Sequence, residues 1–390
     1  MKPWRVAFVV PRYGEEVLGG AEALARSLAE HLAASRLAHV HVLTTCVRDH
    51  STWRNELPQG QSVVNGVSVW RFTVDHVHRD VGRYDVLYNR LIRGENLSSD
   101  EQYEWVHHGA HSPELYMYLE RQGPADDYLI FVPYLFGTKY YGSAILPRRS
   151  ILWPCLHDEV YAGLIPTREM YHASIGVMFN TYPESRLAWR LLGHHPGSQI
   201  VGCGFSTLQA DGERFRNRSG LRVPFVLYSG RFESDKNLPL LIRCFIEYKR
   251  RRGGPLRLVL MGQGLEPIPA HRDIVVLGFK QVQEKLDVYA TATLLCQPSI
   301  NESLSIVIME SWLTGVPVLV HADCEVTCHH AVQSNGDLYF GDYEEFESVL
   351  DLLLDNESLR RRLAENGRTY VETHYNWTVV LGRFEGALGS

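Results

Sequence analysis

Residues 293–320 read TLLCQPSINESLSIVIMESWLTGVPVLV, with an apolar run at each end and a polar segment after the first run. The two end runs predict buried strands, and the segment that begins near Leu304 predicts a helix between them. Ser303 is a suitable N-cap for this helix. A strand, a helix and a second strand in this order are typical of a parallel sheet covered by helices. The stretch therefore predicts one unit of an α/β fold.

The same alternation of apolar runs and helical segments extends in both directions along the chain. A polar stretch at 207–222 divides it into two series. With 390 residues, the chain corresponds to two or three domains of roughly 150 residues. Residues 46–125 are rich in His, Tyr, Arg and Asp and show no clear periodicity. The pattern predicts two doubly wound domains, whose strands we expect at 5–10, 39–45, 67–74, 128–136, 150–158 and 175–181, and then at 223–232, 256–262 and 293–299.

Composition excludes several classes of protein. Hydrophobic residues make up 45% of the chain and charged residues 22%, which is ordinary for a globular protein. A formal charge of −6 argues against non-specific nucleic-acid binding, which needs a basic surface. No apolar stretch approaches the ~20 residues of a membrane span, and the N-terminus lacks the pattern of a signal peptide. Seven cysteines without a CxxC motif predict free thiols and a cytoplasmic protein.

Glycines follow the first predicted strand, in PRYGEEVLGGAEAL. In open α/β sheets, ligands bind beyond the carboxyl ends of the strands. Gly19 and Gly20 would let the backbone approach a ligand and would open a helix whose free amides suit a phosphate. The lysine and hydroxyl residue of a P-loop are missing after these glycines, and so is the GxGxxG of a dinucleotide site. The alternative is that the two glycines only form a tight turn.

Two cations follow a strand of the second series, in LYSGRFESDKN. Gly230 ends the strand, and Arg231 and Lys236 lie in the loop before the next helix. Two cations at the carboxyl end of a strand suit a diphosphate. The alternative is a pair of solvated surface charges, which is the more common situation for Arg and Lys.

Two glutamates flank the apolar part of the opening stretch. Glu302 is predicted in the loop after the strand, and Glu310 inside the helix. A separation of eight residues spans about 12 Å of helix, which is longer than the roughly 5–9 Å between the paired carboxylates of glycosidases. It suits two contacts on one extended ligand, with the helix N-terminus holding negative charge between them. The alternative is that both glutamates face water on an amphipathic helix.

Taken together and in this order, these stretches resemble the retaining GT-B glycosyltransferases of the large family-four group that shares an E-x7-E motif. Glu302 and Glu310 match the two glutamates, and WLTGVPVLV continues the motif as in that family. SGRFESDKN resembles its donor-diphosphate loop, LGGAE its N-terminal glycine loop, and FNTYPESRL and IVGCGFST its closing N-domain segment. The chain departs from the family at Leu304 and Ser305, where Phe-Gly is common.

The resemblance implies a GT-B fold with two doubly wound Rossmann-like domains and an interdomain cleft. The acceptor would bind to residues 1–205, onto which a C-terminal helix at about 376–390 packs, and the nucleotide-sugar donor to residues 206–375. The implied reaction moves a hexosyl group from a UDP- or GDP-sugar to a glycan, a lipid-linked sugar or a small-molecule hydroxyl. No cofactor and no divalent metal would be required.

The resemblance also implies roles for individual residues. Glu302 would accept hydrogen bonds from the donor sugar, and Glu310 from the ribose hydroxyls. Arg231 and Lys236 would neutralise the leaving nucleotide diphosphate, as its expulsion without a metal requires. His157, in WPCLHDEVYAG, would contact the sugar or the acceptor and counts with Glu302, Arg231 and Lys236 as catalytic. The other implied contacts to the donor are Gly19, Gly20, Gly230, Phe279, Leu304, Ser305 and Ile306, and those to the acceptor are Asp158, Glu159 and His111.

Two other classes of protein fit parts of the pattern. A nicotinamide-dependent dehydrogenase shares the sheet architecture but needs the missing fingerprint, and a non-catalytic nucleotide-sugar-binding module would keep the fold without the reaction. Cys324, Cys328, His329 and His330 have the chemistry of metal ligands but lack the spacing of a zinc site, so no metal is expected. The basic run EYKRRRGG (247–254) is expected to be solvated near a helix end, with weak contact to anionic lipid as an alternative.

Overall fold

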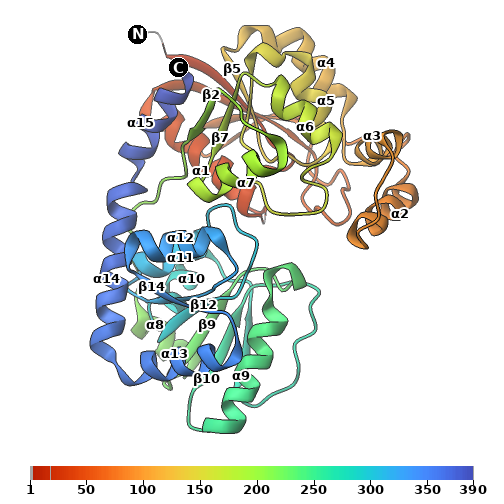
Figure 1. The fold of residues 1–390 in the computed structure, drawn as a ribbon. Helices are drawn as coiled ribbons and strands as arrows, with labels where there is room; N and C mark the ends of the chain where they lie inside the picture. Colours follow the sequence, from red (N-terminus) through yellow and green to blue (C-terminus); the bar gives the residue numbers. More distant parts are fainter. Residues whose placement is uncertain (1–2, 18, 390) are drawn as a thin grey trace. The chain divides into compact units, whose positions relative to one another are not determined.

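The computed structural model describes residues 3–17 and 19–389. The chain forms two compact units (Figure 1). The N-terminal unit comprises Met1–Gly204 and Trp377–Ser390, and the C-terminal unit comprises Phe205–Asn376. Each unit has its own sheet, and helices lie on both faces of each sheet in Figure 1.

The N-terminal unit contains an eight-stranded sheet in the order β3-β4-β2-β1-β5-β6-β7-β8. Neighbouring strands are parallel except β3 and β4, which pair antiparallel at one edge. Of this edge hairpin, the sequence predicts β4, in the expected strand at 67–74, but not β3. The strands are Trp4–Val9 (β1), Ala38–Thr45 (β2), Gly60–Val64 (β3), Val67–Phe72 (β4), Tyr128–Phe131 (β5), Ser150–Leu152 (β6), Gly176–Phe179 (β7) and Ser198–Ile200 (β8).

The C-terminal unit contains a six-stranded parallel sheet in the order β11-β10-β9-β12-β13-β14. All five residues of the central strand β9 are buried, as its continuous apolar sequence predicts. The two sheets confirm the predicted α/β class with two Rossmann-like domains. The strands are Phe225–Ser229 (β9), Arg257–Met261 (β10), Ile274–Gly278 (β11), Leu294–Gln297 (β12), Val318–His321 (β13) and Asp337–Phe340 (β14).

The helices of the N-terminal unit include three that the sequence pattern did not indicate. Of these, α3 buries only Trp105, so its sequence carries almost no apolar stripe. It is defined instead by a capping box, in which Ser98 and Glu101 bond to each other's backbone amides. The helices are Gly20–Ser35 (α1), Val81–Ile92 (α2), Ser99–His108 (α3), Pro113–Gln122 (α4), Gly137–Ile145 (α5), Ile165–Ala173 (α6), Tyr182–Leu192 (α7) and Trp377–Leu388 (α15).

In the C-terminal unit, the longest helix packs against the helix of the opening stretch. The fully buried ring of Trp312 lies against Gly367, where an added Cβ would come within 2.3 Å of the ring. Trp312 also donates a hydrogen bond to the carbonyl of Gly336, at 3.0 Å. The helices are Gly212–Ser219 (α8), Leu238–Arg252 (α9), Val282–Tyr289 (α10), Ile306–Leu313 (α11), Glu325–Ser334 (α12), Tyr343–Asp355 (α13) and Glu357–His374 (α14).

The two ends of the C-terminal unit lie side by side. Phe205 forms a parallel β-bridge with Asn376, and its amide donates to the carbonyl of Tyr375 at 2.7 Å. The next residue, Trp377, begins α15 in the N-terminal unit and stacks on His31 of α1, with ring centroids 3.6 Å apart. The chain therefore leaves the N-terminal unit and returns to it at neighbouring points.

The basic run at 247–254 is not simply solvated, as the sequence analysis had expected. Lys249 is buried, and its ammonium donates to the carbonyls of Gly254 and Leu256 beyond the end of α9. Arg251 and Arg252 both pair with Glu347 of α13. Lys249 also pairs with Asp273 at 3.4 Å, and this ion pair with the two carbonyls compensates its buried charge. Among the described residues, no helix is long and apolar enough to cross a membrane.

Candidate active site

The loops that follow β9 and β10 are bonded to each other. The amide of Gly230 donates to the carbonyl of Met261 at 3.0 Å, and that of Phe232 to the carbonyl of Gln263 at 2.8 Å. Gly262 has a φ of 145°, and a Cβ there would lie 1.8 Å from the Gly230 carbonyl oxygen. The close approach therefore requires glycine, and it fixes the backbone that carries Arg231.

Gly262 and Gly264 are site-building residues that the sequence analysis did not select. A Cβ on Gly264 would lie 2.2 Å from the carbonyl oxygen of Phe232. The signal was present in LVLMGQG, where two glycines directly follow an apolar strand. The need for glycine is not visible in the sequence, because the partner of each glycine lies in the loop after β9.

Both predicted cations have acidic partners in the structure. Arg231 pairs with Glu233 at 2.9 Å and with Asp235 at 3.7 Å, and its side chain is 43% exposed. Lys236 is largely buried, and its ammonium lies 3.1 Å from the carboxylate of Glu302. Burial acts to lower the pKa of Lys236, but Glu302 and Asp235 outweigh it and raise that pKa. Lys236 is therefore charged.

Glu302 lies in the loop before α11, as predicted. One of its carboxylate oxygens accepts from Lys236 and also from the side-chain amide of Gln297, at 3.2 Å. Lys236 donates in addition to the carbonyl of Asn301, at 3.2 Å. The last residue of β12, the 3-10 turn at Ser234–Lys236 and the loop before α11 thus converge on one carboxylate.

Glu310 lies inside α11, as predicted, and pairs with Lys285 of α10 at 2.5 Å. Its second oxygen is buried and has no hydrogen-bond partner within the described part of the chain. Burial and then the Glu310 carboxylate raise the pKa of Tyr289 well above its ordinary value, so the Tyr289 hydroxyl lies beside Glu310 as a potential donor within the unit.

Helix α11 begins at Ile306, and its N-cap is Ser305 rather than Ser303, so the prediction of the cap was wrong. Ser305 has a left-handed backbone with φ 69°, and this turn prevents the residues before it from joining the helix. Its hydroxyl is buried and makes no hydrogen bond to any described residue. The amide of Ile308 donates to the carbonyl of Ser305 at 3.2 Å, and the amides before it, at the very start of the helix, suit an anion.

The left-handed backbone of Ser305 leads to a prediction about stability. Ser305→Gly is expected to raise the free energy of unfolding by about 0.5–1 kcal/mol, because the relieved strain of about 1–2 kcal/mol exceeds the entropic cost of glycine. Urea unfolding measures the change. Ser303→Gly is the matched control, because Ser303 is not among the residues with positive φ and should lose stability on the same change. Equal losses in both variants would contradict the prediction.

Leu304 is only 1% exposed as a whole residue, so it offers a ligand almost no surface in this structure. Its carbonyl is held by the buried His330 of α12, with 3.0 Å between Nε2 and the oxygen. The other ring nitrogen of His330 lies 3.1 Å from the hydroxyl of Tyr370. Burial lowers the pKa of His330 to about 3, so the ring is neutral. His330, which resembled a metal ligand in the sequence, instead positions the loop before α11.

The buried, neutral His330 predicts a loss of stability in acid. The unfolded chain takes up a proton at this histidine below about pH 6.5, whereas the folded chain does not until about pH 3. The contribution to stability is therefore present above pH 6.5 and is lost as the pH falls. Between pH 7 and pH 5, wild type is expected to lose about 2 kcal/mol more than His330→Gln in urea unfolding. Equal losses would contradict a neutral His330.

Among the described residues, no group of three or more His, Cys, Asp or Glu side chains is placed to hold a metal ion. Cys324 is buried, and Cys328 lies against the carbonyls of His321 and Ala322. Phe279 directly follows β11 and is 49% exposed, so its ring is open to a ligand.

In the N-terminal unit, His157 lies in the loop after β6 and contacts Glu159, with 3.5 Å between Nδ1 and the carboxylate. Tyr134 donates to the other oxygen of Glu159 at 3.0 Å. Burial acts to raise the pKa of Glu159, but His157 and Tyr134 outweigh it and hold that pKa below its ordinary value. Glu159 is thus an anion that orients His157, whereas Asp158 pairs with Arg190 of α7.

Glu184 anchors the loop that carries His157, and the sequence analysis missed it. Its two carboxylate oxygens accept from the amides of Leu156, at 2.7 Å, and Asn180, at 2.6 Å. The side chain is 1% exposed, and burial raises its pKa to about 8. The only sequence signal was its place three residues after Thr181, in the first turn of a helix.

The glycine loop after β1 is crowded at Gly19 and open at Gly20. A Cβ on Gly19 would lie 2.1 Å from the carboxylate of Glu22, which Arg12 holds at 2.6 Å. A Cβ on Gly20 would meet nothing within 4 Å. Gly19 is therefore required by packing, whereas Gly20 only leaves its backbone accessible. The third predicted acceptor contact, His111, is 6% exposed and presents little surface.

The two Rossmann-like units, with acidic and basic side chains gathered at the strand ends, define the GT-B class of fold. Solved structures of this class cover the chain almost completely. Sucrose-phosphate synthase from Thermosynechococcus elongatus matches with a TM-score of 0.74 and 16% identity, over 99% of this chain and 99% of that chain. Anabaena HepE in complex with UDP and glucose matches with a TM-score of 0.72 and 15% identity, over 99% of this chain and 100% of that one.

Sequence comparison identifies the family. Residues 210–370 match the family described as "Glycosyl transferases group 1". The match covers most of the C-terminal unit and agrees with the family resemblance seen in the sequence. A D-inositol 3-phosphate glycosyltransferase from Corynebacterium aurimucosum is 26% identical over 44% of this chain. The match spans 45% of the length of that relative.

Proposed function

We propose that the protein is a retaining glycosyltransferase that transfers a hexosyl group from a nucleotide-diphosphate sugar to a hydroxyl acceptor. The observation that carries the proposal is the cluster of Lys236, Glu302 and Gln297 beside the N-terminus of α11. It combines a charged cation, a carboxylate that can accept sugar hydroxyls, and free amides for phosphate oxygens. The match of residues 210–370 to a glycosyltransferase family supports the same reaction.

Lys236 is suited to hold a leaving diphosphate. An ammonium has three donors, and Lys236 uses two of them on Asn301 and Glu302. The third remains for a phosphate oxygen. Arg231 adds a second, half-exposed guanidinium from the same loop. As the bond to the sugar breaks, negative charge grows on the diphosphate, and these two cations and the amides of α11 stabilise it.

Glu302, in the loop before α11, and Glu310, within α11, bind different parts of the donor. Glu302 accepts from hydroxyls of the sugar, and Glu310, which pairs with Lys285, accepts from the ribose. UDP-glucose is the donor we favour, because HepE structures described as complexes with UDP and with UDP-glucose match almost the whole chain. His157, which pairs with Glu159 in the N-terminal unit, contacts the donor sugar or the acceptor.

A thermal-shift series tests the choice of donor. UDP, GDP and their glucose conjugates are compared with NAD(H), which a dehydrogenase would bind. At 100 times its Kd, a ligand that binds only the folded state stabilises it by about 2.7 kcal/mol. We expect the uridine compounds to give the largest shift. Stabilisation by NAD(H) alone would overturn the proposal, and donor binding without any transfer or hydrolysis would favour a non-catalytic module.

Transfer is expected to persist in excess EDTA. Arg231 and Lys236 occupy the place at which a divalent ion would otherwise neutralise the diphosphate. Transfer of labelled glucose is measured with EDTA alone, and then with magnesium or manganese added in excess over the chelator. Complete loss in EDTA, restored by either ion, would show that the cations are insufficient.

A further inference from the structure

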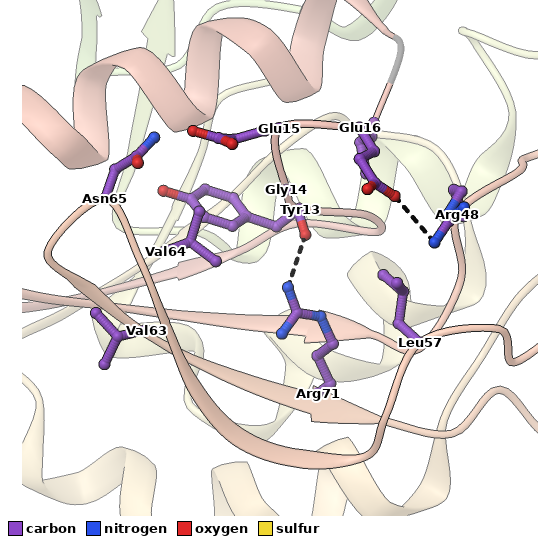
Figure 2. A pocket seen from close by; sticks show the side chains of 11 residues that line it. Tyr13, Gly14, Glu15, Glu16, Arg48, Leu57, Val63, Val64, Asn65 and Arg71 are labelled. Atoms are coloured by element: carbon purple, nitrogen blue, oxygen red, sulfur yellow. Dashed lines mark hydrogen bonds and ion pairs between the residues drawn. The ribbon is translucent and has the colours of Figure 1, made fainter.

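The hollow between the loop at 13–17 and the β3–β4 hairpin has a volume of about 380 Å³ (Figure 2). Glu16 pairs there with Arg48 at 2.9 Å, and Arg71 donates to the carbonyl of Tyr13 at 3.2 Å, as Figure 2 shows. The two arginines that line the hollow therefore have partners in the absence of a ligand. These contacts give no indication of a binding site.

In the C-terminal unit, two side chains of α10 face Glu310 of α11. Lys285 and Tyr289 lie on the same side of α10, because four residues separate them. The ammonium of Lys285 lies 2.5 Å from one carboxylate oxygen of Glu310. Tyr289 is fully buried, and burial and then the charge of Glu310 raise the pKa of its hydroxyl well above the ordinary value. Glu310 thus has a donor group on each of two sides.

Helix α10 also borders the loops to which we assign the donor. Ser229, the last residue of β9, acts to lower the pKa of Tyr289, so its hydroxyl is close to that tyrosine as well. The loop with Arg231 follows β9 directly. At its other end, α10 begins shortly after Phe279, whose ring is open to a ligand. Lys285 therefore lies on an element that adjoins both the diphosphate loop and the loop after β11.

The ammonium of Lys285 has further donors available. An ammonium carries three, and Lys285 makes one hydrogen bond within the described part of the chain, to Glu310. The side chain is 27% exposed, so part of it is open to a ligand. A carboxylate only accepts hydrogen bonds and an ammonium only donates them, whereas a hydroxyl does both. The two groups side by side therefore match a pair of neighbouring hydroxyls, such as those of ribose.

We propose that Lys285 binds the donor ribose together with Glu310, with Lys285 donating to a hydroxyl oxygen and Glu310 accepting from the hydroxyls. Tyr289 acts through Glu310, as a positioning residue. The inference rests on the proposed function, since that function places the ribose at Glu310. It deepens the function by making the pair of Lys285 and Glu310 the basis of a preference for ribonucleotides over deoxyribonucleotides.

Isothermal titration calorimetry on the full-length protein tests the role of Lys285. The probes are UDP, 2′-deoxy-UDP and 3′-deoxy-UDP, which carry the same charge and differ only in one hydroxyl. Wild type is expected to bind UDP about 10- to 100-fold more tightly than at least one deoxy compound, because a hydroxyl between two charged groups is lost. In Lys285→Met this preference should fall about 3- to 10-fold, which is the size of one hydrogen bond.

The preference is a ratio of two Kd values for the same variant, so a partly unfolded sample affects both values equally. The charge of Lys285 attracts the diphosphate of each probe alike, and this long-range effect also cancels in the ratio. Arg272→Met is the matched control, because it removes a cation of the same unit that is 88% exposed. It should keep the preference of wild type.

A double variant separates direct binding from an effect through Glu310. If Lys285 only held the carboxylate in place, its replacement would change nothing further once Glu310 is alanine. We expect instead that the preference for UDP is lower in Glu310→Ala with Lys285→Met than in Glu310→Ala alone, because the ammonium itself contacts the ribose.

Three results would overturn the proposal. They are the absence of any preference for UDP in wild type, an unchanged preference in Lys285→Met, and equal preferences in Glu310→Ala and the double variant. With any of these, UDP still binds and the donor site stands. Failure of UDP to bind wild type would overturn the donor assignment itself, and the role of Lys285 with it, so the two failures are distinguishable.

Discussion

Replacing Lys236 with methionine is expected to lower kcat for transfer by about 100- to 1,000-fold, which is typical for loss of one preorganised contact to a developing charge. Lys236 is charged and nearly buried, and one of its three donors is unused in the free protein. Methionine keeps the length and packing of the side chain but removes the charge. The donor KM should change much less than kcat, because the charge on the diphosphate is largest as the bond breaks.

Donor kinetics on four proteins check this expectation. Arg231→Ala should also lower kcat, whereas Arg272→Met, which removes a cation that is 88% exposed in the same unit, should behave as wild type. Because Lys236→Met leaves Glu302 without its cation, folding is checked by circular dichroism. If Lys236→Met and Arg231→Ala both retained near wild-type kcat, the assignment of the diphosphate site would be wrong.

Glu310→Ala is expected to raise the donor KM about 10- to 100-fold and to leave kcat nearly unchanged. The ribose hydroxyls do not change during the reaction, so their binding is uniform. A hydrogen bond to a charged group contributes about 1.5–3 kcal/mol, which sets the size of the effect. Glu302→Ala should resemble Lys236→Met more closely, because Glu302 orients the sugar that reacts.

Two further variants separate ribose binding from the ion pair within the fold. Glu310→Gln keeps an acceptor for the ribose and should restore part of the affinity, although it weakens the pair with Lys285. Lys285→Met breaks the same pair and leaves the carboxylate, so its KM should rise less than that of Glu310→Ala. A Glu310→Ala enzyme with abolished kcat and unchanged KM would contradict this role.

The fold could be predicted from the sequence wherever the strands are continuously apolar. The run VPFVLYSGRF contains β9, and TLLCQPS contains β12. The helices within residues 46–125 were not predicted from the sequence, because they depend on side-chain caps and bury few residues. Helix α2, for example, is capped by Asp80 and buries only Leu87 and Leu91. An apolar period is the primary signal of a helix in a sequence, and in α2 it was present at Tyr84, Leu87, Tyr88 and Leu91 but half of it is carried by tyrosines.

The sequence selects candidate residues of the site but does not predict the contacts between them. Strand ends and the E-x7-E spacing selected Arg231, Lys236, Glu302 and Glu310. Their ion pairs join residues far apart in the chain, as in the pair of Lys236 with Glu302. The left-handed backbone conformation of Ser305 was also not predicted, because serine seldom adopts it.

The adjacent ends of the C-terminal unit have an evolutionary consequence. The family match at 210–370 falls between the paired residues Phe205 and Asn376. A segment whose two ends lie side by side can be inserted into or removed from a host fold as a cassette, because the host chain needs only a short link to close. Recombination at this junction would exchange the whole C-terminal unit while leaving the strands and core of the N-terminal unit intact.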